Sequence, residues 1–164
     1  TSTIAFFPKS SHAKAIFACD TTNMSTTVET GKGVVPIIEW QDHSFIASVT
    51  PQQRCQNASE KLQQLYNDGE IKYIKTDTVD DYPVICGISK IEDSCLPNGI
   101  LASLKIDAAT DYDHMLPKIL DYRIWGLDYE PSYVSSSLDR SPRLIFQTNK
   151  EIHVNLELFL QKTM

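Results

Sequence analysis

The stretch that decides the fold runs from Thr50 to Gly69 and reads TPQQRCQNASEKLQQLYNDG. Thr50 can cap the first free amides of a helix, Pro51 suits the first helical position, and Gln53 can complete a capping box. Gly69 offers the left-handed residue at which helices stop. Between these signals the apolar residues recur at helical spacing on one side, which predicts an amphipathic helix with a cysteine on its buried face: Cys55, Ala58, Leu62, Leu65 and Tyr66.

Short β-prone segments precede and follow this helix. Before it, residues 15–20 form an apolar run, and residues 26–30 and 34–40 flank Gly31-Lys32-Gly33 as a hairpin would. Pro36 cannot donate to a ladder, so its strand should lie at an edge or carry a bulge. After the helix, residues 71–76, 83–89 and 100–106 predict an antiparallel meander, and residues 143–147 and 151–154 predict a last hairpin.

Two further helical segments are expected near the end of the chain. One runs from about residue 112 to 122, and the other is a terminal turn capped by Asn155. We therefore expect an α+β fold in which one long and one shorter helix pack on a mostly antiparallel sheet. After a flexible N-terminal segment, residues 1–14, a single disulfide-stapled domain should cover residues 15–164.

Charge and hydropathy exclude some partners. The 164 residues include 15 Lys plus Arg and 21 Asp plus Glu, a net charge of −6. Nucleic acid binding needs a cationic surface, which this chain does not offer. No apolar run reaches the roughly 20 residues of a transmembrane segment, so any attachment to a membrane should be peripheral.

Four cysteines occur without the spacing of a zinc or redox motif: Cys19, Cys55, Cys86 and Cys95. Disulfides are the favoured interpretation if the chain is exported, and four reduced core thiols are the alternative. Four cysteines allow three pairings. We favour Cys86 with Cys95, which are close in sequence, and Cys19 with Cys55, which would tie the first strand to the long helix.

No recognisable catalytic or cofactor motif stands out, and we expect no cofactor and no metal. His43 lies between Asp42 and Ser44, but adjacent side chains diverge, so this string is no triad. A hydrolase would have to draw on His43, His114 or His153 and a distant carboxylate. Calcium could be held by Asp77, Asp80 and Asp81 or by Asp107, Asp111 and Asp113, although turn formation and capping explain both sets.

Two features are candidates for ligand or partner contact. Arg54 lies in the first turn of the long helix, where the helix dipole disfavours a cation. It should therefore either pair with a buried carboxylate or present its guanidinium to an anionic ligand. Residues 125–142 lack regular patterning, and Trp125, Tyr129 and Tyr133 there could form a protein-contact surface, since such side chains are enriched at hot spots.

Several blocks of the sequence resemble the cyanobacterial circadian oscillating polypeptide family, named for its apparent mass near 23 kDa. The similar blocks are residues 17–19, 26–28, 35–40, 50–55, 65–69, 72–74 and 83–86. The resemblance implies an exported protein of the periplasm, thylakoid lumen or cell surface, in which the four cysteines are structural bridges. It brings no catalytic residues. We therefore expect a non-enzymatic accessory or protein-binding module, peripheral to a cyanobacterial membrane complex, with an unrecognised hydrolase or a calcium-binding accessory protein as the alternatives.

Overall fold

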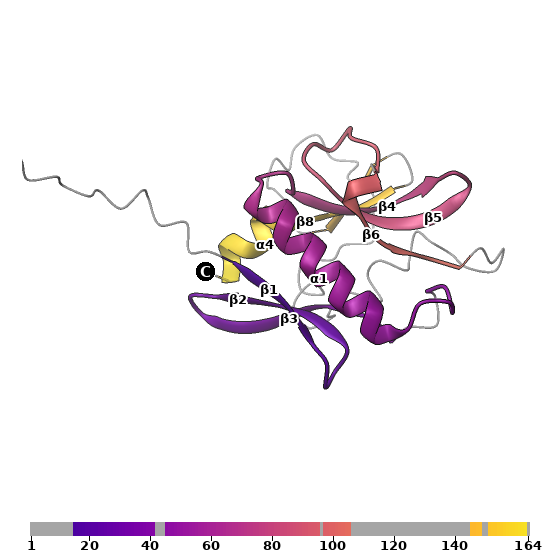
Figure 1. Ribbon diagram of the computed structural model, residues 1–164. Coiled ribbons are helices and arrows are strands. Elements are labelled where there is room, and N and C mark those ends of the chain that lie inside the picture. The colour runs from indigo at the N-terminus through magenta and orange to yellow at the C-terminus, as the bar shows by residue number, and fades with distance from the viewer. Residues whose placement is uncertain (1–14, 42–44, 96, 106–144, 149–150, 164) are drawn as a thin grey trace, which may run out of the picture.

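The computed structural model describes residues 15–41, 45–95, 97–105, 145–148 and 151–163 (Figure 1). The predicted helix at 112–122, the segment 1–14 and the irregular stretch 125–142 lie outside these residues. Within them the chain forms two antiparallel sheets, one main helix and one short helix, which confirms the α+β class.

The first three strands form a sheet of their own, in the order β1-β2-β3: β1 (Ile16–Asp20), β2 (Ser25–Thr30) and β3 (Gly33–Glu39). Pro36 meets both expectations. It lies in an edge strand, and the β2–β3 register shifts between Thr26 and Thr27, so that Ile37 is the extra residue of a bulge. Because Pro36 has no N–H and the strand is bulged, β3 is poorly suited to pairing with a further strand.

The other five strands form the second sheet, in the order β6-β5-β4-β8-β7: β4 (Tyr73–Val79), β5 (Tyr82–Ile88), β6 (Ile100–Ser103), β7 (Ile145–Thr148) and β8 (Glu151–Asn155). The predicted meander and closing hairpin are both present. Asp80 and Asp81, with φ of 50° and 66°, form the two-residue turn between β4 and β5. Asp tolerates this left-handed conformation better than most residues. The strands form two sheets where a single sheet was expected, since in the described part of the chain β1–β3 and β4–β8 pair only within their own groups.

The long helix α1 (Pro51–Asn67) begins as predicted. Thr50 Oγ1 accepts a hydrogen bond from the Gln53 amide at 3.2 Å, and Gln53 Oε1 accepts one from the Thr50 amide at 3.0 Å. Gly69 follows the helix with φ of 68°. A short helix, α4 (Leu156–Thr163), follows Asn155, whose Oδ1 accepts a hydrogen bond from the Leu158 amide at 3.0 Å. A 3-10 turn, η1 (Pro97–Gly99), precedes β6.

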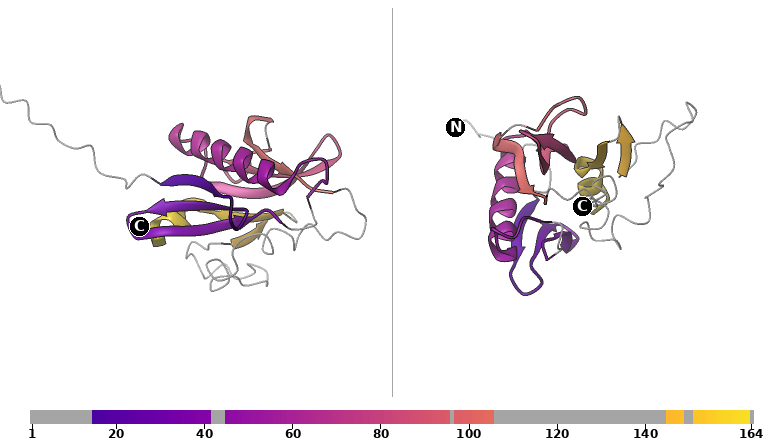
Figure 2. Two further views of the ribbon diagram at one scale, coloured as in Figure 1. Left: turned by 60° about the horizontal axis from the view of Figure 1, so that its bottom comes forward. Right: turned by 90° about the vertical axis from the view of Figure 1, so that its right-hand side faces the viewer.

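One hydrophobic cluster unites both sheets and both helices. The views of Figure 2 show α1 lying along one side of the two sheets. Its buried residues, such as Leu62, belong to the same cluster as Val28 and Ile38 of the first sheet, Ile85 of the second and Phe159 of α4. Among the described residues, no helix has the length and apolar character needed to cross a membrane.

Candidate functional site

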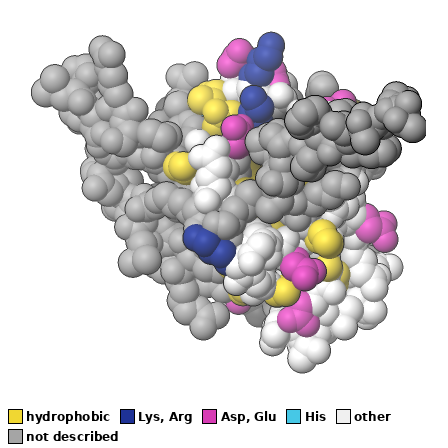
Figure 3. Space-filling view, turned by 90° about the vertical axis from the view of Figure 1, so that its left-hand side faces the viewer, with side chains coloured by type: hydrophobic (Ala, Val, Ile, Leu, Met, Phe, Trp, Pro, Cys, Tyr) yellow, Lys and Arg dark blue, Asp and Glu magenta, His cyan; other side chains and the backbone are white. Residues whose placement is uncertain are grey.

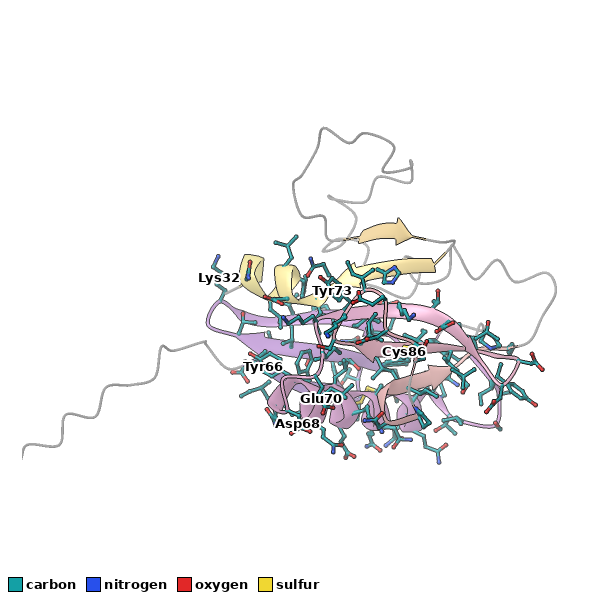
Figure 4. All side chains as sticks on the ribbon, turned by 90° about the horizontal axis from the view of Figure 1, so that it is seen from above. Lys32, Tyr66, Asp68, Glu70, Tyr73 and Cys86 are labelled. Carbon is teal, nitrogen blue, oxygen red and sulfur yellow. A yellow bond between two sulfur atoms is a disulfide. The ribbon has the colours of Figure 1, made fainter. Side chains whose placement is uncertain are left out.

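Two disulfides link strands to neighbouring segments, and both join the cysteines that the sequence analysis paired. Cys19–Cys55 joins β1 to the first turns of α1, with the Cα atoms 5.4 Å apart. Cys86–Cys95 joins β5 to the segment before η1, with the Cα atoms 5.7 Å apart, and Figure 4 labels Cys86 within the five-stranded sheet. No cysteine is free. The prediction of disulfides over reduced core thiols is confirmed.

Arg54 is buried and hydrogen-bonded to the backbone. Its guanidinium donates to three backbone carbonyl oxygens, those of Trp40, Ile46 and Val49, and its Cζ lies 4.8 Å from the centroid of the Phe45 ring. Burial lowers the pKa of Arg54, and only 7% of the residue is exposed. The expected carboxylate partner is absent among the described residues, because neutral carbonyl groups take its place. The chain between β3 and α1 is thereby tied to the helix, and little of the guanidinium faces solvent.

The free edge of β1 is closed by α1. Gln63 Oε1 accepts from the Phe17 amide at 2.7 Å, and Gln63 Nε2 donates to the Ala15 carbonyl at 3.4 Å. One side-chain amide thus pairs with the strand much as a neighbouring strand would. The Tyr66 hydroxyl, labelled in Figure 4, accepts from the Ala15 amide at 3.4 Å. An additional strand could not pair with these groups without displacing the helix side chains.

The inner face of the three-stranded sheet is fixed to α1 by a buried polar chain. Trp40 Nε1 donates to Thr26 Oγ1 at 2.8 Å, and Thr26 Oγ1 and Ser59 Oγ lie 2.9 Å apart. All three residues are buried. A buried hydrogen-bonded group holds its partners in one geometry, so β2, the end of β3 and α1 keep a fixed relation.

The opposite side of this sheet, here called the open face, is available to solvent. Exposed aliphatic side chains lie there beside carboxylates: Ile16 is 50% exposed, Val34 is 63% exposed, and Glu29 lies between them. In the lower part of Figure 3, where this sheet lies, acidic side chains occur next to hydrophobic ones. Cross-strand pairing arranges the face in three rows, namely Ile16, Glu29 and Val34; Ala18, Thr27 and Pro36; and Asp20, Ser25 and Glu39.

A groove of about 610 Å³ crosses the open face. Its walls include the apolar side chains of Val34 and Pro36 and the carboxylates of Asp20 and Glu39. Asp20 accepts hydrogen bonds from Asn23 and Thr22, and these bonds lower its pKa. Sequence reasoning did not single out this face, because alternation along β1 and β2 separates two faces without showing which of them is covered.

The five-stranded sheet carries a second polar group of residues on the side away from α1. Lys75 is 3% exposed, and its Nζ lies 3.3 Å from Asp77 Oδ2, which also accepts the Cys95 amide at 3.4 Å. Burial raises the pKa of Asp77, but the amide hydrogen bonds and Lys75 outweigh it, and the net effect is a lowered pKa. His153, with an exposed fraction of 0%, lies opposite Lys75 in the β4–β8 ladder. These groups join strands to the Cys86–Cys95 disulfide.

Most of the other predicted site residues lie outside the described part of the chain. These are His43, His114, Trp125, Tyr129, Tyr133 and the aspartates at 107, 111 and 113. Within it, no group of three His, Cys, Asp or Glu side chains could hold a metal ion. Of the other candidate calcium ligands, Asp77 pairs with Lys75, and Asp80 and Asp81 form the β4–β5 turn.

In the described residues, fold and surface define a disulfide-stapled α+β protein in which the outer face of the three-stranded sheet is exposed. The family model described as Circadian oscillating protein COP23 matches residues 16–161, and the chain belongs to this family. No curated protein and no solved structure matches the chain.

Proposed function

We propose that this protein is a non-enzymatic, exported accessory module that binds another protein. It acts in the periplasm, the thylakoid lumen or at the surface of a cyanobacterial cell, held peripherally at a membrane complex. The observation that carries the proposal is the open face: a sheet whose inner face is tied to α1 and whose β1 edge is closed still exposes aliphatic side chains outward. A preorganised surface of this kind loses little conformational freedom on binding.

The two disulfides support the exported location. Cytosolic thiols are kept reduced, whereas disulfides persist in oxidising compartments. In the chain-entropy model, closing the loops of 36 and 9 residues contributes roughly 4 and 3 kcal/mol, comparable with the net stability of a domain. A chain that depends on these bonds for much of its stability suits a compartment in which they form.

The compartment can be tested on the native protein. Cells are lysed in denaturant with an alkylating agent and no reductant, and the intact mass of the protein is measured. We expect no alkylated cysteine before reduction and four after it. Four alkylated cysteines without reduction would overturn the exported location.

The binding role needs a separate test. Native membranes are washed at low and at high salt, and complexes are crosslinked before extraction. We expect the protein to remain with the membranes at low salt, in crosslinked complexes, and to be released by high salt without detergent. Recovery only as a free monomer that turns over a substrate would instead support the hydrolase alternative.

A further inference from the structure

We propose that the open face binds a cationic, extended segment of another protein. This inference rests on the proposed function and specifies the chemistry of the partner. It follows from the charge, the apolar side chains and the geometry of the three rows.

The three rows of the open face contain Asp20, Glu29 and Glu39 but no lysine or arginine, and Lys32 lies outside the rows, in the turn between β2 and β3. Asp20, Glu29 and Glu39 form no ion pair within the described ranges, where the two salt bridges both involve residues of the other sheet or of α4. The hydrogen bonds that Asp20 accepts come from neutral groups of its own turn. Each of the two outer rows therefore presents at least one carboxylate to a ligand. Lysine or arginine side chains are the complementary groups.

The same carboxylates disfavour binding of a second copy of this chain, of an anionic lipid surface or of a nucleic acid. A two-fold dimer through this face would bring the carboxylates of two copies together, because such an interface uses the same patch twice. An anionic lipid surface and a nucleic acid would be repelled likewise. A cationic segment of a different protein remains as the occupant.

The apolar side chains of the open face indicate which residues accompany the cationic groups of the bound segment. Val34 and Ile16 are more exposed than most aliphatic residues that the structure describes, and Pro36 lies on the wall of the groove. Glu29 and Ser25 are four residues apart on β2, which places the two outer rows about 13 Å apart at ~3.3 Å per residue. An extended segment with a cationic residue at every fourth position has the same spacing. Its intervening apolar residues would then lie over the middle row, which contains Pro36, and Ile16 and Val34 would flank the cationic residue that meets Glu29.

Binding to the face differs from the addition of a strand to an edge. At the β1 edge, Gln63 already bonds the backbone of Ala15 and Phe17. At the β3 edge, Pro36 and the bulge interrupt a regular ladder. Recognition therefore depends on side chains of the open face, and substitutions there should change the affinity.

The test uses the full chain with both disulfides intact and a fluorescent synthetic peptide that has lysine at every fourth position and valine between. Fluorescence anisotropy measures its affinity, beside that of a peptide with glutamate for lysine and of a peptide with all its lysines at one end. We expect the spaced lysine peptide to bind most tightly and the glutamate peptide not to bind. Equal binding of the spaced and clustered lysine peptides, or no binding of either, would overturn the proposal.

Charge reversal on the open face gives the matched control. Glu29→Lys or Glu39→Lys should weaken binding about tenfold or more, because an attraction becomes a repulsion. Glu60→Lys, on the exposed side of α1, changes the net charge equally and should leave the affinity within about twofold. All three side chains are exposed, so the variants should unfold like the parent protein. An equal effect of all three substitutions would mean attraction to net charge only and would contradict a site on this face.

Sedimentation of the protein without peptide tests whether a second copy of the chain occupies the open face. Dimerisation that rises with concentration and is abolished by Val34→Asp would identify a second copy as the occupant and overturn the proposal. If the lysine peptides fail while the protein still remains with native membranes in crosslinked complexes, this inference fails and the proposed function stands. If the protein is instead a free monomer with turnover, the proposed function fails.

Discussion

Replacing Arg54 by methionine should strongly destabilise the protein. Methionine retains part of the apolar stem and removes the guanidinium, so the experiment isolates the hydrogen bonds from cavity formation. The Trp40 carbonyl loses a donor in a buried position, and the carbonyls of Ile46 and Val49 lose theirs in partly buried ones. The segment between β3 and α1 would then be held mainly by packing.

The size of the effect follows from these contacts. A buried carbonyl without a donor costs ~1–3 kcal/mol, and the two carbonyls that water can approach cost less. Loss of the contact with the Phe45 ring adds ~0.5–1 kcal/mol. We expect the free energy of unfolding to fall by about 3 kcal/mol.

Urea unfolding followed by far-UV circular dichroism, with the disulfides intact, measures this loss. Lys61→Met removes the same charge from the same helix and should cost under ~0.5 kcal/mol. Arg54→Lys should lie between the two, because one ammonium group cannot span three carbonyls. The loss for Arg54→Met should also persist at high salt, since its partners are neutral. A loss below ~0.5 kcal/mol, or one that disappears at high salt, would refute the assignment of carbonyl partners.

Three further predictions concern the five-stranded sheet. Gly87→Ala places a Cβ 2.5 Å from Ile71 Cδ1, so it should lower the free energy of unfolding in urea by ~1–3 kcal/mol. The loss should be smaller in a protein that also carries Ile71→Val, which removes the clashing methyl group, and additive losses of the two substitutions would contradict the clash. Asp77→Asn should destabilise the protein above pH 3.8, because a carboxyl whose pKa is lowered on folding stabilises the folded state above its unfolded value. The difference from the parent protein should vanish as the pH falls through the lowered folded pKa, and a pH-independent difference in unfolding free energy would count against the ion pair. Replacing both Cys86 and Cys95 by alanine should lower the unfolding free energy by ~3 kcal/mol, and an unchanged urea midpoint would show that the bond adds nothing.

Local signals allowed much of the fold to be predicted from the sequence. The cap at Thr50 and Gln53, the stop at Gly69 and the bulge near Pro36 each depend on residues close together in the chain. The cysteine pairing was also accessible, because Cys86 and Cys95 are near neighbours in sequence. These are the features for which local chemistry and tertiary structure agree.

The proposed binding surface could not be predicted in the same way. Alternation along β1 shows that Phe17 and Ile16 point to opposite faces, but only the position of α1 decides which face is covered. Gln63 would be expected to face solvent on a helix, and its pairing with β1 depends on tertiary contact. The burial of Arg54 required a partner, but no local rule indicates that three carbonyls of an irregular segment would supply it.

The face away from α1 is buried in the five-stranded sheet and exposed in the three-stranded sheet, and this contrast favours the open face as the binding surface. On the five-stranded sheet, Lys75 and His153 are almost fully buried on that side, and the cation is paired with Asp77. On the three-stranded sheet, aliphatic side chains and carboxylates remain exposed although Cys19–Cys55 ties the same sheet to the helix. Exposing Ile16 and Val34 on a covalently fixed sheet gives no stability to the isolated chain, since burial of apolar area is what stabilises. Covering them with a second molecule would gain this contribution, which supports the proposed binding, and the neighbouring carboxylates favour a cationic partner.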